Sequence, residues 1–88
     1  MDYEKLSYVL RAKTRKKVVM IMDRIRMPSE LKKELKIEDS NIARALRELE
    51  KANLIKCLTP KQKMGKLFTL TAEGEKIRKE IKGKNSAR

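Results

Sequence analysis

Two short strand-like runs in the second half of the chain interrupt a sequence that is otherwise patterned as helices. The runs cover residues 54–58 and 66–70, and the loop between them contains Pro60 and Gly65, two lysines and no acidic residue. Runs of this length separated by a turn-rich loop predict a β-hairpin. One hairpin among helical segments restricts a chain of 88 residues to a single, mainly α domain with a small sheet.

The segments before the hairpin carry apolar residues at helical spacing. We expect one helix over residues 3–12, a second that Thr14 caps and that ends at Met27, a third over Pro28–Leu35 and a fourth over about 39–52. The third starts at a proline because proline is favoured at the first position of a helix. The expected inward-facing residues are Tyr3, Leu6 and Leu10, then Val18, Ile21, Met22 and Ile25, then Leu31 and Leu35, and finally Ile42, Ala45, Leu46 and Leu49.

Residues beside the hairpin predict how the neighbouring helices end and begin. Asn53 follows the fourth helix where a left-handed residue is expected, because asparagine commonly replaces glycine there. Thr71 is expected to cap a last helix over residues 72–82, which has acidic residues in its first turn and basic residues towards its end. We therefore expect a folded domain over residues 1–82 and a flexible basic tail over residues 83–88.

The charge of the chain is large and unevenly distributed. Lysine and arginine number 24 against 12 acidic residues, a formal net charge of +12. Residues 1–26 carry net +5, residues 27–58 carry +1 and residues 59–88 carry +6. This excess favours a polyanionic partner. A membrane surface is a poor candidate because large aromatic anchors are scarce. Enrichment in lysine and glutamate with few amides is typical of thermophile proteins.

The inventory of reactive side chains excludes most enzyme classes. The chain has no histidine and Cys57 is its one cysteine, which excludes histidine catalysis, multi-thiolate metal sites and an intrachain disulfide. It has no glycine-rich phosphate loop. We therefore expect no enzyme activity, no cofactor and no metal. The N-terminal residues lack the plan of a signal peptide and no apolar run is long enough to cross a membrane, so we expect a cytoplasmic protein.

A short helix, a tight turn, a second helix and then a basic hairpin follow one another in the order of a winged helix-turn-helix domain. Over roughly residues 7–82 the chain resembles winged helix-turn-helix transcriptional regulators, most closely the small archaeal ones related to the MarR and ArsR groups. The segments that carry the resemblance are Lys13–Val18, Pro28–Leu31, Ser40–Glu50 and Leu67–Thr71. The resemblance implies a recognition helix at about 39–52 in the major groove of DNA and a wing at 59–66 against the adjacent backbone or minor groove.

The chain also departs from this family. Lys36 stands where family members often have glycine in the turn between the two helices, and Glu38 stands where serine or threonine commonly caps the recognition helix. Metal sensing in the ArsR group uses clustered cysteine and histidine, which this chain lacks. The resemblance therefore does not extend to a metal sensor.

The face of the expected recognition helix that lies opposite its apolar stripe supplies the candidate base-reading residues. Asparagine can pair with adenine and arginine with guanine through two hydrogen bonds each, and serine can reach bases or phosphates. Lysines around the hairpin tip, the serine after Pro28 and two basic residues of the second helix are candidates for phosphate contacts. The expected DNA-binding residues are Arg15, Lys16, Ser29, Ser40, Asn41, Arg44, Arg47, Lys61, Lys63 and Lys66.

These residues predict a sequence-specific transcriptional regulator that binds double-stranded DNA, with a homodimer contact through the first and last helices. Two alternatives use the same sequence differently. A nonspecific nucleic-acid-binding protein requires only the net positive charge to attract phosphates, although an aromatic content of 3% disfavours stacking on single strands. A winged helix that serves as a protein-interaction module needs neither base contacts nor salt-dependent affinity for DNA.

Overall fold

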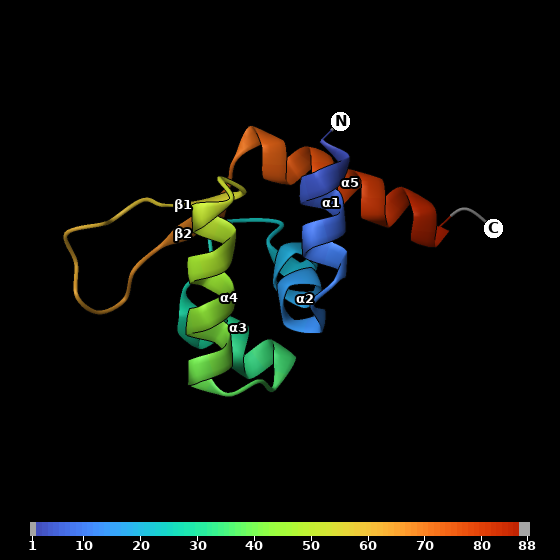
Figure 1. Ribbon diagram of the computed structural model, residues 1–88. Coiled ribbons are helices and arrows are strands. Elements are labelled where there is room, and N and C mark those ends of the chain that lie inside the picture. The colour runs from blue at the N-terminus through green and yellow to red at the C-terminus, as the bar shows by residue number, and fades with distance from the viewer. Residues whose placement is uncertain (1, 87–88) are drawn as a thin grey trace.

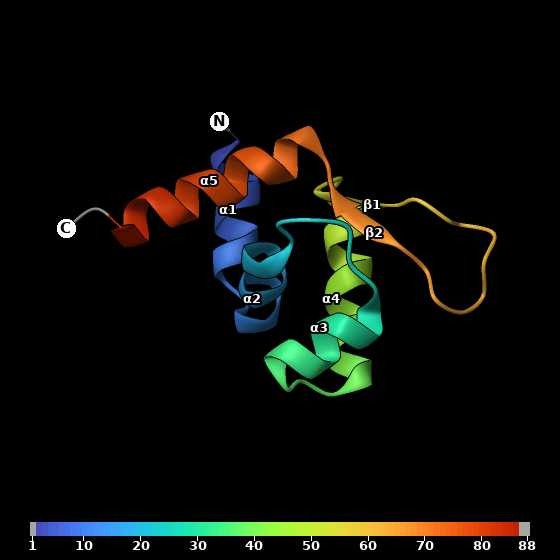
Figure 2. The same ribbon diagram turned by 180° about the vertical axis from the view of Figure 1, so that it is seen from behind.

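The computed structural model describes residues 2–86, and the side chains of residues 2–83, as five helices around a small antiparallel sheet (Figure 1). A long hairpin loop projects from one side of the molecule, and Figure 2 shows the same arrangement from behind. No helix within this described part is long and apolar enough to cross a membrane. In chain order the elements are α1 (Tyr3–Leu10), α2 (Lys13–Ile21), α3 (Pro28–Leu35), α4 (Asp39–Lys51), β1 (Ile55–Cys57), β2 (Phe68–Leu70) and α5 (Ala72–Ser86).

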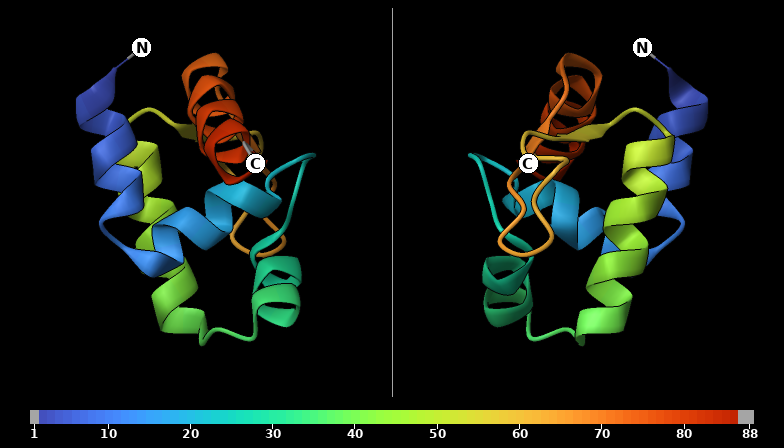
Figure 3. Two further views of the ribbon diagram at one scale, coloured as in Figure 1. Left: turned by 90° about the vertical axis from the view of Figure 1, so that its right-hand side faces the viewer. Right: turned by 90° about the vertical axis from the view of Figure 1, so that its left-hand side faces the viewer.

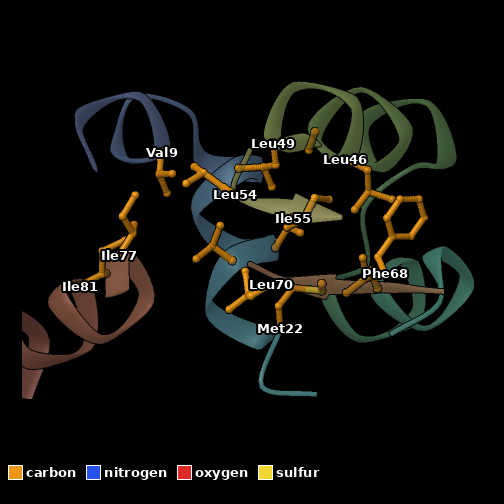
Figure 4. Packing of buried hydrophobic residues seen from close by; sticks show 14 of the residues in the cluster. Val9, Met22, Leu46, Leu49, Leu54, Ile55, Phe68, Leu70, Ile77 and Ile81 are labelled. Atoms are coloured by element: carbon orange, nitrogen blue, oxygen red, sulfur yellow. The ribbon is translucent and has the colours of Figure 1, made fainter. Parts of the chain in front are cut away.

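Helix α4 packs into the core through the apolar stripe that its sequence predicts, and all four residues of that stripe are buried. Figure 4 shows Leu46 beside the ring of Phe68 on β2, while Val9 of α1 and Ile77 of α5 lie near one another at the other end of the core. Burial of one large aliphatic side chain contributes about 1.5–3 kcal/mol. The stripe therefore fixes which face of α4 points outward.

The helix-turn-helix formed by α3 and α4 has the bounds that the sequence predicts. Pro28 opens α3, and the Glu30 carboxylate accepts a hydrogen bond from the backbone N–H of Met27 at 3.0 Å. In the turn, Lys36 adopts the left-handed conformation with φ 56° and ψ 46°. This conformation costs a side chain other than glycine about 1 kcal/mol. Asn53, after α4, is also left-handed as predicted, with φ 63°.

The sheet is smaller than the predicted strands but gains a third backbone segment. Cys57 pairs with Phe68 and Ile55 with Leu70 in an antiparallel register, so each strand has three residues and is shorter than its predicted run. Arg26, in the connection between α2 and α3, adds a bridge to Phe68 through two backbone hydrogen bonds of 2.9 Å. The base of the hairpin is therefore held from both sides.

Arg26 is the one charged residue in the buried core of the described chain, with 3% of its surface exposed. Its guanidinium donates to the carboxylate of Glu34 on α3, to Asp23 at 3.3 Å and to the carbonyl of Ile21 at 3.1 Å. The hydrogen bond to Glu34 raises the pKa of Arg26 although burial opposes the charge. This cluster joins the end of α2, the C-terminal end of α3 and the base of the hairpin.

Thr71 caps α5 as predicted. Its hydroxyl oxygen accepts the backbone N–H of Gly74 at 3.0 Å, and its hydroxyl donates to the carbonyl of Asn53 at 2.8 Å. The helix continues to Ser86, beyond the predicted end at residue 82 and through part of the predicted tail at 83–88. Residues 87–88 of that tail lie outside the described residues.

The predicted start of the second helix is wrong. Ala12, not Thr14, precedes α2, and its carbonyl accepts the N–H of Lys16 at 3.0 Å. Thr14 therefore lies within the first helical turn. No side chain of the described residues caps this end of α2.

The predicted end of the second helix and part of its apolar stripe are wrong as well. α2 ends at Ile21, and Ile25 is 51% exposed because the chain leaves the helix to pair Arg26 with β2. In α1 the buried residues are Leu6 and Val9. The other two residues of the predicted α1 stripe, Tyr3 and Leu10, are 68% and 43% exposed.

Candidate nucleic-acid interface

The outward face of α4 is polar because the apolar stripe takes up the opposite face. Ser40, Asn41, Arg44 and Arg47 are all exposed, and the first three lie in the first two turns of the helix. Figure 3, right, looks onto this side of the molecule, with the hairpin loop in front, α4 on one side of it and α3 on the other. The predicted base-reading residues therefore occur on a helix face that no other element covers.

Two contacts from other helices fix the position of α4. The Arg15 guanidinium lies 3.7 Å from the centre of the Tyr8 ring, donates to the Tyr8 carbonyl at 2.6 and 2.9 Å and reaches Glu48 on α4 at 3.0 Å. At the other end of α4, Lys32 donates to Asp39 at 3.1 Å. Arg15, with 12% of its side chain exposed, thus joins α1, α2 and α4 from within the fold.

The wing, residues 59–66, is shaped by short-range hydrogen bonds at its base. The N–H of Leu58 donates to the carbonyl of Leu67 at 2.8 Å, and the N–H of Leu67 donates to the hydroxyl oxygen of Thr59 at 3.0 Å. Gly65 has a φ of 67°, a conformation that glycine adopts without steric cost. These features turn the chain back at the tip, where Lys61 and Lys63 are exposed, while Lys66 is half-buried.

A groove of about 470 Å³ lies between α4 and the wing. Arg47 borders it on the helix side, and Lys63 and Lys66 border it on the wing side. Asp39 and Glu50 line the same groove. The positive charge is therefore confined to part of the groove, and a phosphate would meet cations there from two separate elements.

The structure brings most of the predicted DNA-binding residues to one side of the molecule. Helix α4 and the wing both lie on the side seen in Figure 3, right, and Ser29 is exposed in the first turn of α3 next to Pro28, which itself lines the groove. Two predicted residues are not in this group. Arg15 is held by Tyr8 and Glu48, and Lys16 lines a different groove beside Leu35, on the other side of α2.

Asp39, Glu50 and Gly65 line the interface groove but were not among the expected DNA-binding residues. Asp39 and Glu50 place negative charge in it, and Gly65 shapes the tip of the wing. The glycine had a signal in the sequence, since it lies in a turn between two strand-like runs. The position of the acidic pair was not predictable, because helical spacing alone does not say which residues of α4 face the wing.

No family model matches the sequence, and no curated protein matches it. A solved MarR family transcription regulator superposes with a TM-score of 0.78 at 24% identity, and HlyU from Vibrio cholerae superposes with a TM-score of 0.71 at 18% identity. The chain has a winged-helix fold. The predicted fold class, mainly α with a small β-hairpin, is thereby confirmed.

The two winged-helix structures differ in how much of them this chain spans. The match to the MarR family regulator covers 90% of this chain and 56% of that one. The match to HlyU covers 99% of this chain and 98% of HlyU. The winged helix described here therefore corresponds to part of one of these proteins and to nearly all of the other.

Proposed function

We propose that this winged helix is a sequence-specific transcriptional regulator that binds double-stranded DNA. The observation that carries the proposal is the groove between α4 and the lysine-bearing wing, which Arg47 borders on the helix side and Lys63 and Lys66 border on the wing side. The fold that it shares with a MarR family transcription regulator supports the same function. The major groove of B-DNA is about 12 Å wide and accepts one α-helix.

In the proposed complex the first turns of α4 enter the major groove. Asn41 and Arg44 are exposed on the side of α4 away from the core and read base edges, with arginine suited to guanine and asparagine to adenine. Glu48 is held by Arg15, which keeps that carboxylate away from the phosphates. Sequence choice therefore comes from the N-terminal half of α4.

The wing and the start of α3 supply the proposed backbone contacts. Lys61 and Lys63 are exposed on the wing, and Ser29 is exposed at the start of α3. Contacts of this kind set the position of the protein on the duplex without carrying sequence information. Arg15 is left out of the interface because the fold itself uses its guanidinium.

The direct test is selection of bound fragments from a pool of random duplexes, followed by titration of the selected duplex and a scrambled one at several salt concentrations. We expect one preferred sequence and an affinity for both duplexes that falls with salt. Equal affinity for the two duplexes would leave only nonspecific binding, and absence of any salt-dependent affinity would favour a protein-interaction module.

Arg44→Ala is expected to reduce discrimination between the selected and scrambled duplexes by about 1–3 kcal/mol, because a bidentate contact to a base is lost. The measurement is fluorescence anisotropy with both duplexes at one salt concentration. Arg11→Ala is the matched control, since Arg11 is exposed at the end of α1, and α1 lies on the far side of α4 from the wing in Figure 1. An unchanged affinity ratio in Arg44→Ala would remove this residue from the reading face.

Lys63→Ala is expected to weaken binding to both duplexes alike and to lower the slope of log affinity against log salt by about one unit. The reason is that one lysine–phosphate contact accounts for about one released counterion. Lys76→Ala on α5, also exposed, is the control and should keep the slope. A loss confined to the selected duplex would mean that Lys63 contacts a base.

We also propose that two copies pair through α1 and α5. Tyr3 and Leu10 support this, because they leave apolar surface exposed on the outer side of α1. A symmetric pair would bind half-sites about 34–36 Å apart, and the selected sequence would be a palindrome. Sedimentation equilibrium should give twice the chain mass of 10.3 kDa, and Tyr3→Glu/Leu10→Glu should return it to the single-chain value. A single-chain mass for the unaltered protein would contradict the pairing.

A further inference from the structure

A second groove lies on the side of the molecule away from the wing. It has a volume of about 400 Å³ and runs between α2 and the last residue of α3. In Figure 1 α2 lies on the opposite side of α4 from the wing, and Figure 3, left, looks onto this side with the wing behind. We call it the α2 groove, and its lining residues are Lys13, Lys16, Lys17, Met20, Ile21 and Leu35.

The α2 groove has an apolar floor and a basic rim. Met20, Ile21 and Leu35 are partly buried, so each still offers apolar surface to a partner. The other three lining residues are lysines, and none of them forms an ion pair within the described chain. No acidic residue lines the groove. A partner that complements it must therefore be both apolar and negatively charged.

The basic residues at the start of α2 are unfavourable for helix stability. The N-terminal turn of a helix favours acidic side chains because its free N–H groups carry partial positive charge. α2 begins with Lys13, Arg15 and Lys16, has no acidic residue in its first turn and has no side-chain cap. Arg15 has an internal role, whereas the lysines have none in the described structure. Local conflicts of this kind occur where a binding function maintains them.

We propose that the α2 groove binds an acidic amphipathic segment of another protein. The partner is a helix that places leucine-like side chains on the apolar floor and glutamate or aspartate beside the three lysines. Methionine in the floor suits this role, because its flexible side chain adapts to different apolar partners. Because the groove lies away from α4 and the wing, the segment binds while the DNA interface remains accessible.

A duplex is the less suitable occupant of the α2 groove. Nucleic acid would satisfy the lysines through its phosphates, but it would leave the partly buried floor of Met20, Ile21 and Leu35 without an apolar partner. A second copy of this chain is assigned to α1 and α5 by the proposed pairing, and with 24 basic against 12 acidic residues it offers the three lysines few acidic partners. A flat anionic membrane does not fill a concave groove.

The test uses the full chain and a fluorescein-labelled peptide of about 18 residues, five helical turns, with leucine on one face and glutamate on the other. The comparison probes are a peptide of the same composition whose order forms no apolar face, a random-sequence duplex and phosphatidylserine vesicles. We expect the amphipathic peptide to bind about tenfold more tightly than the reordered one. Amide NMR shifts should change at residues 13–21 and 35.

Lys16→Glu/Lys17→Glu is expected to weaken peptide binding about tenfold. Its melting temperature should not fall, since glutamate suits the start of a helix better than lysine. Lys56→Glu/Lys76→Glu makes the same change of charge at two exposed positions outside the groove and should leave the affinity within about threefold.

Several results would overturn the proposal. One is equal affinity for the amphipathic and the reordered peptide. Another is an equal loss of peptide affinity in Lys16→Glu/Lys17→Glu and Lys56→Glu/Lys76→Glu. Either result would mean that charge alone attracts the peptide. NMR shifts confined to α4 and the wing would place the peptide on the DNA interface instead. The groove would be assigned to vesicles or to the duplex if that probe bound more tightly than the peptide and if Lys16→Glu/Lys17→Glu weakened its binding. Loss of sequence-specific DNA binding is measured separately and does not affect these readouts.

Discussion

Replacing Gly74 by alanine is expected to lower the free energy of unfolding by about 3 kcal/mol or more. A Cβ at this position would lie 2.1 Å from the carbonyl oxygen of Leu54, far inside van der Waals contact. That carbonyl cannot retreat easily, because it accepts the N–H of Thr71 at 3.0 Å and Leu54 itself is fully buried. The higher helix propensity of alanine stabilises the variant by only about 1 kcal/mol, so the steric overlap determines the sign of the change.

Thermal unfolding followed by circular dichroism measures the effect of Gly74→Ala. A domain of this size loses about 4–8 °C of melting temperature for each kcal/mol, so we expect a fall of at least about 12 °C. Gly83→Ala is the matched control on the same helix, since nothing lies within 4 Å of its added Cβ. That variant should gain about 0.5–1 kcal/mol. A Gly74→Ala protein as stable as the unaltered one would contradict the close docking of α5 on residues 53–54.

The helix-turn-helix was predictable because its determinants are local. Pro28 marks the first turn of α3, the apolar spacing of α4 identifies its buried face, and Asn53 marks its end. Each of these signals acts within a few residues of the structure that it predicts. Once the buried face of α4 is known the opposite face follows, so the outward position of Asn41 and Arg44 could be predicted too.

The features that the sequence analysis missed depend on contacts between distant segments. The spacing of Val18 to Ile25 fits a longer helix, and what ends α2 is the pairing of Arg26 with Phe68, far along the chain. Gly74 is needed only because α5 begins against the carbonyl of Leu54. Periodicity contains no information about such partners.

The same reason explains why two neighbouring predicted site residues lie in different surroundings. Arg15 and Lys16 are adjacent basic residues near the start of α2, and charge alone assigns both to DNA. In the fold Arg15 turns inward to Tyr8 and Glu48, whereas Lys16 borders the α2 groove. Neighbours in a helix point in different directions, so their roles depend on which elements pack against each side.

Glu34→Ala is expected to lower the free energy of unfolding by about 2–3 kcal/mol. The substitution removes the carboxylate that faces the guanidinium of Arg26, whose side chain is 4% exposed. The buried charge would keep only Asp23 at 3.3 Å and the Ile21 carbonyl at 3.1 Å. The loss is not larger because the Glu34 side chain is 46% exposed, so water replaces part of the lost hydrogen bonding to the buried guanidinium. Chemical unfolding at neutral pH measures the change.

Asp39→Ala provides the matched control, since it removes the acidic partner from another ion pair of α3. There the side chains of Lys32 and Asp39 are 51% and 80% exposed, so the loss should stay below about 1 kcal/mol. Arg26→Met/Glu34→Leu should recover much of the stability lost in Glu34→Ala, because it removes both charges and keeps apolar volume. Equal losses in Glu34→Ala and Asp39→Ala would show that burial does not strengthen the Arg26 pair.

Because the Arg26 backbone also pairs with β2, Glu34→Ala should in addition loosen the base of the wing and weaken DNA binding to all sequences alike.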